Sequence, residues 1–441
     1  DGAALPYNWI VAQDFTVLRE GTYDFEFFGT GDDRIAFYIG GSIADVNTNV
    51  PTITGGQQIG GKHQSWTTIG NLTGSATLTA GGHTAYMVLE DLGGATFAAI
   101  GSSTFTLPSG TIVQNGAELE LRSVNYTEVD KVTLDGGTLS ATGTSSWAGD
   151  VVLSDSSTVS TGTSVDLTVL GDVSGTAATN LTKSGAGKVT LEGINTYGGD
   201  TQIDAGTFKV TGTLADTTDI TVESGARYEA ASTDTVGSIA GAGTVDIAST
   251  YTLTTGNNNS STTLSGAITG GGHFTKIGTG TMTLGGANTF TGNTTISAGG
   301  LTLTGTLGYT SAGVGSYAGN ISNSGTLTIN TDATQTLSGA ITGSGSFTQA
   351  HADGETILTS TSNSYTGATT ISDGILRIGD GGATGSLAGT GTIANDGALI
   401  FDTTLNIVVD KSINGIGTLE QAGSGETTLT GSNTYSGTTT I

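Results

Sequence analysis

The chain has 441 residues, and its 38 acidic and 12 basic side chains give a formal net charge of −26. A surface of this sign repels phosphate backbones and anionic lipid headgroups, which argues against nucleic-acid binding and electrostatic membrane docking. Only 35% of the residues are hydrophobic, while 74 are Gly and 3 are Pro. This composition is too poor in apolar residues for a globular domain of this length, but it suits a thin core with many tight corners.

The chain contains no cysteine, which favours passage through a bacterial envelope. No run of 18 apolar residues exists, so nothing spans a membrane as a helix. Asp1 is not a start methionine, so we expect the front of the chain to be processed or trimmed. Together these features predict a secreted or cell-surface bacterial protein.

Residues 1–105 differ from the rest of the chain in composition and pattern, because they are richer in aromatic residues and lack internal repeats. Alternating segments at 14–18, 22–28, 35–39, 76–78 and 85–90 are separated by Gly-rich turns. Strands at this spacing predict a small antiparallel β-sandwich or jelly roll.

This front block resembles the protective-antigen-type β-sandwich of bacterial toxins, glycosidases and fungal adhesins, through the segments 21–41 and 78–90. In lectin-like members a pair of adjacent aspartates binds Ca²⁺, which then coordinates sugar hydroxyls. The resemblance places Asp32 and Asp33 on that pair. Calcium needs six to eight oxygen ligands, and Asp45, Asn47 and Asn49 could add some. Alternatively, Asp32 and Asp33 only hydrogen-bond the backbone of their own turn.

Residues 106–441 carry one recurring pattern, with copies near 181–214, 274–307, 347–380 and 419–441. Apolar residues alternate with Thr or Ser in each copy, as in Met282-Thr283-Leu284, and Gly or Asn separates these short segments. Such alternation predicts short strands with one face inward. Strands this short with corners this tight predict a parallel β-helix, whose units bury their apolar faces only against their neighbours. At about 22 to 25 residues per coil it would have roughly 13 to 15 coils and a length of about 65 to 70 Å.

The most constant element is N-T-Y-x-G-x-T-x-I, which begins at Asn195, Asn288, Asn363 and Asn433. Its ring, at Tyr197, Phe290, Tyr365 and Tyr435, could be a platform on which sugars stack. We favour a structural interpretation, in which the ring fills a corner of the solenoid and the Asn side chain satisfies turn backbone.

These repeats resemble the passenger-associated repeat of bacterial autotransporters over roughly residues 110–441. The resemblance implies a right-handed β-helix on a secreted or cell-surface protein, many relatives being adhesins. Since the last copy stops at Ile441 inside a repeat, we expect either further chain or a neighbouring molecule to cover that coil.

No convergent catalytic cluster is visible. His63, His83, His273 and His351 lie in unrelated contexts without metal-ligand spacing. The basic residues are scattered, and Lys183 and Lys276, which share one repeat position, are expected on the outside wall. Polysaccharide cleavage therefore has little support, and we predict that the protein is not an enzyme.

The leading hypothesis is a non-enzymatic structural or adhesive protein, with a rigid β-helical stalk that carries a small contact domain. Its partners would be glycans or proteins on host or neighbouring cells. One alternative is a filament or surface-layer subunit that stacks head to tail through uncapped coils. Another is a calcium-dependent glycan-binding adhesin that uses Asp32 and Asp33. Apart from this calcium, the sequence suggests no cofactor.

Overall fold

The computed structural model describes residues 111–311, 313–389 and 391–441, apart from the side chain of Thr310, and the backbone of the strands between Asn8 and Ile100. Every regular element within these residues is a β-strand, as the sequence predicted. Among them there is accordingly no helix long and apolar enough to cross a bilayer. The chain divides into two compact units, Asp1–Gly199 and Asp200–Ile441.

The front of the first unit is antiparallel. β8 pairs with β1 on one side and with β3 on the other, and β2 pairs with β7. The strands of this part are β1 (Asn8–Val17), β2 (Gly21–Phe27), β3 (Arg34–Ile39), β4 (Ser42–Asp45), β5 (Thr52–Thr54), β6 (Gln57–Gln58), β7 (Leu72–Leu78) and β8 (Gly81–Glu90).

The rest of the first unit is a parallel solenoid in which each turn contributes strands to separate sheets. The first sheet contains β9 (Phe97–Ile100), β11 (Glu118–Leu121), β14 (Thr138–Ala141), β17 (Ser157–Thr161) and β20 (Leu181–Ser184). The second contains β10 (Thr111–Gln114), β13 (Val132–Asp135), β16 (Val151–Asp155) and β19 (Val173–Gly175). The third contains β12 (Asn125–Tyr126), β15 (Ser145–Trp147), β18 (Asp166–Val169) and β21 (Lys188–Leu191).

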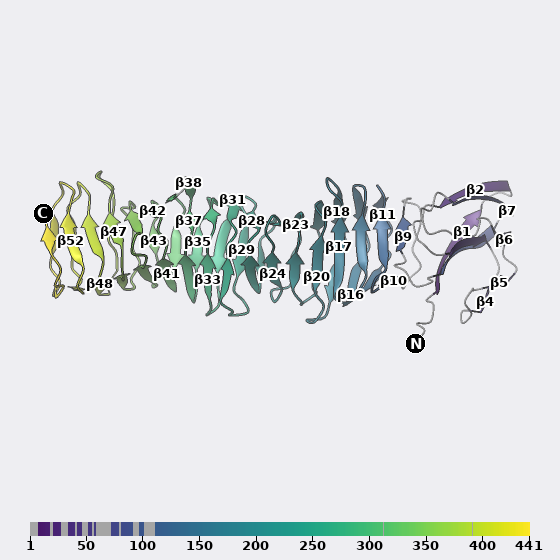
Figure 1. The fold of residues 1–441 in the computed structure, drawn as a ribbon, viewed down its shortest axis with the longest axis horizontal. Coiled ribbons are helices and arrows are strands. Elements are labelled where there is room, and N and C mark those ends of the chain that lie inside the picture. The colour runs from purple at the N-terminus through teal and green to yellow at the C-terminus, as the bar shows by residue number, and fades with distance from the viewer. Residues whose placement is uncertain are drawn as a thin grey trace. The chain divides into compact units, whose positions relative to one another are not determined.

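The second unit repeats this arrangement, and Figure 1 shows its strands side by side. We call its longest sheet the long sheet: β22 (Thr201–Ile203), β24 (Asp219–Val222), β27 (Ser238–Gly241), β30 (Thr262–Leu264), β33 (Thr281–Leu284), β36 (Gly300–Leu303), β41 (Thr326–Ile329), β44 (Ser346–Gln349), β46 (Thr369–Ile371), β48 (Ile393–Asn395) and β51 (Ile413–Asn414).

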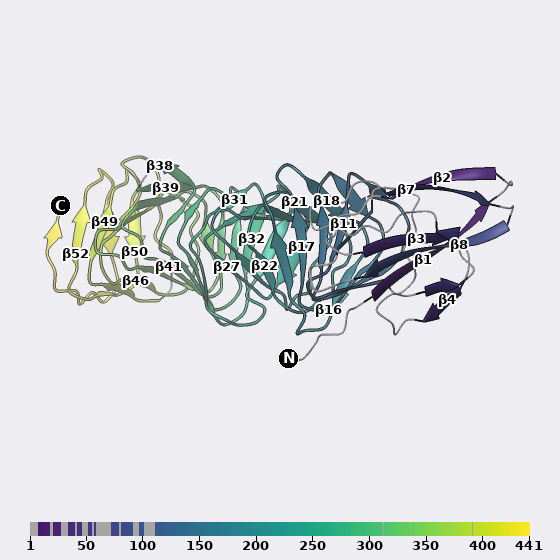
Figure 2. The same ribbon diagram turned by 45° about the vertical axis from the view of Figure 1, so that its right-hand side comes forward.

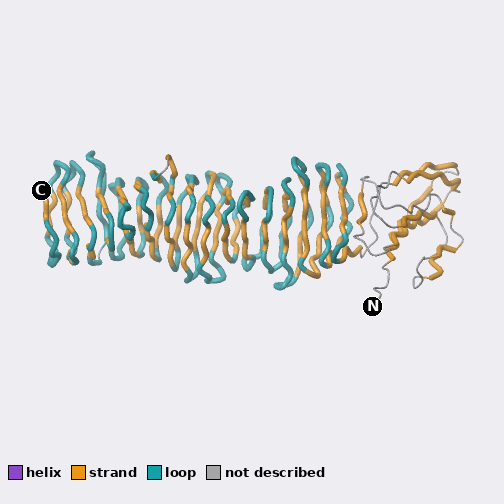
Figure 3. Tube along the Cα trace, in the orientation of Figure 1, coloured by secondary structure: helices purple, strands orange, loops and turns teal. Residues whose placement is uncertain are grey.

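The other strands of the second unit form shorter sheets, and Figures 2 and 3 show strands alternating with loops through each turn. One contains β23 (Thr207–Val210), β25 (Arg227–Ala230), β28 (Thr244–Ile247) and β31 (Ile268–Gly270). The next contains β26 (Asp234–Val236), β29 (Thr252–Thr255), β32 (His273–Lys276), β35 (Thr294–Ile296), β40 (Ile321–Asn323) and β43 (Ile341–Thr342). A further one contains β38 (Tyr309–Ser311), β39 (Val314–Tyr317), β42 (Thr334–Leu337), β45 (Glu355–Leu358), β47 (Ile375–Ile378), β49 (Ala398–Phe401), β52 (Thr418–Gln421) and β54 (Thr439–Thr440). Two pairs complete the unit: β34 (Ala287–Asn288) with β37 (Thr306–Leu307), and β50 (Ile407–Val409) with β53 (Thr427–Leu429).

The first sheet and the long sheet together contain 16 strands, from β9 to β51, one from each turn. The solenoid therefore has about 16 turns. The predicted parallel β-solenoid is confirmed, whereas its right-handedness stays a prediction. The expected number of coils was slightly low because some turns are short. One of them runs only from Thr283 to its strand partner Thr302.

Alternating burial along the strands builds the core. In β44 the inward Phe347 is fully buried, while its neighbours Ser346 and Thr348 face outward and are half-buried. The strand register places apolar side chains next to apolar side chains of the neighbouring turns, because Leu301 pairs with Leu327 and Leu327 pairs with Phe347. Aromatic rings stack in the same way in the first unit, where Tyr126 lies on Trp147 with ring centroids 4.5 Å apart. The core is therefore a row of apolar side chains along each sheet.

Glycine serves the corners in two ways. Gly185 adopts a φ of 74°, which a side chain would strain. At Gly187 the backbone is ordinary, but an added Cβ would lie 2.2 Å from the carbonyl oxygen of Gly162 in the preceding turn. The second reason, close approach of stacked turns, is not visible in the sequence.

Opposite faces of β44 should respond differently to truncation. We expect Phe347→Ala to cost about 3 to 5 kcal/mol, because it leaves a cavity between stacked turns. Thr348→Ala, on the outward face of the same strand, should stay within about 0.5 kcal/mol. Urea denaturation followed by circular dichroism, with hydrogen exchange on β41, β44 and β46, measures both. Equal losses in the two variants would contradict the assigned strand faces.

Candidate functional site

The calcium residues predicted from the sequence, Asp32 and Asp33, lie outside the described residues, between β2 and β3. His63 also lies outside the described residues, and for His83 only the backbone is described. Among the described side chains, no three His, Asp or Glu residues come together in a way that could hold a metal ion. The calcium site therefore stays a prediction.

The rings of the repeated N-T-Y motif are core residues. Tyr197 is fully buried, and Phe290 and Tyr365 are 1% exposed. Tyr365 lies 6.3 Å from Phe347 between ring centroids, and its hydroxyl contacts Thr369 Oγ1 at 2.7 Å. Only the ring of the last copy, Tyr435, is half-buried. The sugar-platform interpretation is wrong for the three buried rings.

The Asn residues of the motif satisfy backbone groups of their own and neighbouring turns, which agrees with the structural interpretation. Asn288 accepts the Ile268 N–H at 2.8 Å and donates from Nδ2 to the Gly286 and Thr306 carbonyl oxygens. The other copies accept the equivalent N–H at 2.9 to 3.1 Å, at Asn195, Asn363 and Asn433. This position locks one turn onto the next and is not available to a ligand.

The expectation that Lys183 and Lys276 lie on the outside wall is wrong. Their exposed fractions are 0% and 1%. Lys183 Nζ donates to the carbonyl oxygens of Ser184 and Gly185, both at 2.7 Å. Lys276 Nζ donates to those of Ile277 and Gly278 at 2.5 and 3.1 Å. Each ammonium thus points inward and binds the carbonyls of the glycine turn that follows its own strand.

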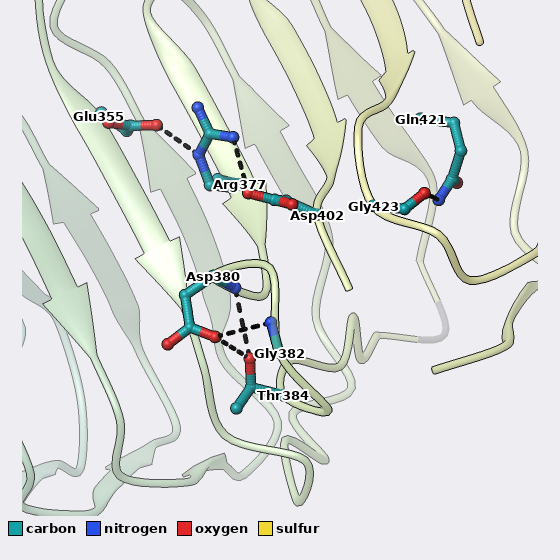
Figure 4. A network of polar contacts seen from close by, with 8 residues as sticks. All are labelled: Glu355, Arg377, Asp380, Gly382, Thr384, Asp402, Gln421 and Gly423. Atoms are coloured by element: carbon teal, nitrogen blue, oxygen red, sulfur yellow. Dashed lines mark hydrogen bonds and ion pairs between the residues drawn. The ribbon is translucent and has the colours of Figure 1, made fainter. Parts of the chain in front are cut away.

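Copies without lysine use an amide at this position. Gln349 Nε2 donates to the His351 and Gly354 carbonyl oxygens at 3.3 and 3.2 Å. Gln421 Nε2 donates to those of Gly423 and Gly425, both at 2.9 Å, and Figure 4 shows the first of these bonds. The shared requirement is a long inward side chain that ends in N–H donors. Lys and Gln both meet it, which explains why they exchange in the repeat.

Burial lowers the pKa of Lys183 to about 8 and also lowers the pKa of Lys276.

A buried acidic residue, Asp234, binds backbone amides in a similar way. Asp234, 6% exposed, accepts the N–H groups of Leu214 and Thr235 at 2.9 and 3.0 Å. Burial raises its pKa to about 6. The interior charges of the solenoid thus hold backbone, a structural role.

On the outer wall of the solenoid, a polar network centres on Arg377 of β47 (Figure 4). Its Nε donates to Glu355 Oε1 at 2.6 Å and its Nη1 to Asp402 Oδ2 at 3.2 Å, which links three successive turns. A nearby loop closes on itself through Asp380, which accepts from the Thr384 hydroxyl and the Gly382 N–H. The network is anionic overall, and it ties turns together.

Other cations of the outer wall are likewise paired with carboxylates. Lys209 Nζ lies 2.8 Å from Glu229 and Arg227 Nη2 lies 3.1 Å from Asp246. Lys188 lies 2.8 Å from Asp166, and Lys411 lies 2.5 Å from Asp410. These cations are neutralised locally, so they do not form a basic patch for an anionic substrate.

The residues that sequence reasoning missed are the outward threonines of the long sheet. Register places six of them on consecutive strands, from β30 to β46: Thr263, Thr283, Thr302, Thr328, Thr348 and Thr370. All six are half-buried or exposed. A parallel rank, two residues earlier on four of these strands, contains Thr281, Gly300, Thr326 and Ser346. We call these two ranks the threonine face.

A further row of hydroxyls runs along the sheet from β26 to β43. Its members are in register and half-buried or exposed: Thr235, Thr254, Thr275, Thr295, Ser322 and Thr342. This row is bordered by His273, whose Nδ1 accepts the Asn293 N–H at 2.9 Å. The outer wall therefore presents repeated neutral hydroxyls.

The comparisons with known proteins agree with this repeat architecture. A family model described as the Passenger-associated-transport-repeat matches residues 181–210, 274–303, 353–378 and 419–441. These matches fall within the four predicted copies. They support a passenger-type β-solenoid and indicate a secreted or cell-surface bacterial protein.

The chain is also similar to the adhesin BmaC autotransporter of Brucella suis biovar 1 (strain 1330). Identity is 33% over 181 residues, which cover 38% of this chain and 5% of that protein. The chain thus spans only a small part of the relative that it matches. No solved structure gives a significant match.

Lys183→Gln should raise stability at neutral pH, because Gln supplies N–H donors without a buried charge. The pKa of Lys183 in the native protein, about 8, lies below the ordinary lysine value of 10.5. Native protein therefore binds fewer protons than unfolded protein between these values, and wild-type stability rises with pH through this window. The advantage of the Gln variant should shrink accordingly. Urea midpoints at pH 7 and pH 10 measure this effect.

Lys183→Met is the matched control, since it removes the donors and keeps an unbranched side chain. The Ser184 and Gly185 carbonyls would lose this partner, at a cost of about 1 to 3 kcal/mol for each acceptor left unsatisfied. If Met were tolerated as well as Gln, the turn-locking role of this position would be refuted.

Arg377→Met should destabilise the protein by about 1 kcal/mol, because it leaves Glu355 and Asp402 as unpaired carboxylates on nearby turns. High salt should reduce this loss by screening their repulsion. Lys411→Met, at a pair whose Asp410 side chain is 68% exposed, is the control and should change little. Urea midpoints at low and high NaCl concentration measure both. A loss at Arg377 that does not depend on salt would argue for packing instead of charge.

Proposed function

We propose that the chain is a non-enzymatic, adhesive passenger segment that acts outside the bacterial cell. The observation that carries this proposal is the coincidence of the matched passenger-associated repeats with turns of a parallel β-solenoid. A relative named as an adhesin contains a similar segment, which favours adhesion over other extracellular roles. In this role the solenoid extends the chain away from the cell and presents its wall to a partner.

The interior supports a structural role. Its polar groups, such as Lys276 and Asn288, bind turn backbone and are not arranged around a substrate. On the outside, paired cations such as Arg377 serve turn-to-turn contacts. These arrangements favour a scaffold whose surface binds, over one that performs chemistry.

Two finer hypotheses stay predictions from the sequence. One is a β-sandwich contact domain at the front of the chain, with calcium-dependent glycan binding at Asp32 and Asp33. The other is a filament that grows by stacking of coils. Both depend on features that the sequence suggests, and loss of glycan binding in Asp33→Ala would be the test of the first.

Adhesion can be measured with beads that carry the purified 441-residue chain. We expect such beads to be retained on monolayers of cultured epithelial cells more strongly than beads carrying an unrelated acidic protein at equal density. The same preparation should release no reducing ends from neutral or acidic polysaccharides. Retention no better than that of the control beads would refute the adhesive role, and sugar release would refute the non-enzymatic one.

A further inference from the structure

The threonine face differs from an ordinary exposed sheet in the regularity of its chemistry. Its first rank places a hydroxyl and a methyl group at the same position of six consecutive strands, from Thr263 to Thr370. Its second rank, from Thr281 to Ser346, contains only Thr, Ser and Gly. Neither rank includes a charged or aromatic side chain, although the chain as a whole carries a net charge of −26.

The hydroxyls of the first rank are not used by the fold. Within the described residues, none of the six donates to or accepts from another group of the protein through its hydroxyl. In the second rank, the Ser346 and Thr326 hydroxyls contact each other at 3.3 Å. Because a hydroxyl has one donor and two acceptor sites, the face presents a regular set of unused hydrogen-bonding groups.

Strand geometry sets the spacing of these groups. Neighbouring parallel strands lie about 4.8 Å apart, and residues i and i+2 of one strand lie about 6.6 Å apart on the same face. The threonine face is therefore a two-dimensional grid with these two repeats. Both repeats are similar to those of the oxygen atoms on faces of hexagonal ice.

The side-chain chemistry also suits a water lattice. A threonine hydroxyl can replace a water molecule in a hydrogen-bonded layer, while its methyl group orders the water beside it. The β-branched side chain is stiff about χ1, so the grid loses little conformational entropy when it is held against a rigid surface. A charged side chain would instead impose its own hydration shell, and the two ranks contain none.

We propose that the threonine face binds the surface of ice. This inference goes beyond the adhesive role and does not depend on it, because a chain that fails to bind cells could still bind ice. A crystalline polysaccharide is the other periodic ligand to consider. It is less suited, since sugar-binding faces rely on aromatic rings for stacking and on carboxylates or amides for paired hydrogen bonds. The two ranks have neither type of side chain.

The test uses the full chain fused to a green fluorescent carrier, with ice grown slowly from the solution. The wild-type fusion should be incorporated into the ice, and the unfused chain should produce thermal hysteresis in a nanolitre osmometer. Thr328→Lys places a charge at the centre of the face, and incorporation should fall to that of the carrier alone.

Thr336→Lys is the matched control, because Thr336 is also an outward, half-buried residue of a strand, but it lies in β42, outside the long sheet. This variant should be incorporated like the wild type. Circular dichroism and urea midpoints should be the same for both variants, since neither residue is part of the core.

Three results would overturn the proposal. The wild-type fusion could be excluded from ice like the carrier, or the two lysine variants could keep or lose incorporation equally. The third is that microcrystalline cellulose or chitin retains the wild type but not Thr328→Lys, while ice excludes both. That result would assign the face to a crystalline polysaccharide.

Discussion

The structure depends on one constraint, that each turn of the chain must place its backbone hydrogen bonds on the turn before it. In parallel stacking, each residue lies next to the residue at the same position of the next turn. Equivalent side chains therefore form rows along the solenoid. Inside, this gives apolar rows such as Leu301, Leu327 and Phe347. At corners, it brings backbones so close that Gly187 has no room for a side chain. A thin core suffices because each row continues from turn to turn.

The same constraint creates a polar problem inside the solenoid. A strand that ends in a tight glycine turn directs carbonyl oxygens towards the interior, where an unpaired acceptor is costly. Lys183, Lys276, Gln349 and Gln421 solve it with side chains that bend back onto the turn. An ammonium makes strong bonds but must be desolvated, whereas an amide makes weaker bonds at a smaller cost. That both occur at one repeat position shows that the turn requires a donor and not a charge.

Much of the solenoid could be predicted from the sequence, because alternation and glycine spacing act locally. The burial of Lys183 and Lys276 could have been predicted as well. Phe274 is two residues before Lys276 in the same strand, and residues two apart share a face. The general preference of lysine for solvent outweighed this signal. The threonine face could not be assembled from sequence, because the turn between Thr302 and Thr328 contains an insertion that hides their pairing. Register is a property of backbone hydrogen bonds, which sequence spacing does not fix when turns differ in length.

On the outer wall the fold accepts many different side chains. A regular pattern of side chains there is therefore informative, because the fold does not require it. Threonine is favoured on exposed strands by its branched shape, so a single outward threonine needs no further explanation. Yet outward positions elsewhere in the same unit carry Lys209, Glu229 and Arg377. In the long sheet itself, the row that contains Thr370 continues with Ala394 and Asn414 in the next two turns. Stacking thus accepts several side chains at this position. This run of six threonines, like the row of hydroxyls from Thr235 to Thr342, is more uniform than strand propensity demands. Such uniformity is what a surface needs in order to match a ligand that is itself periodic.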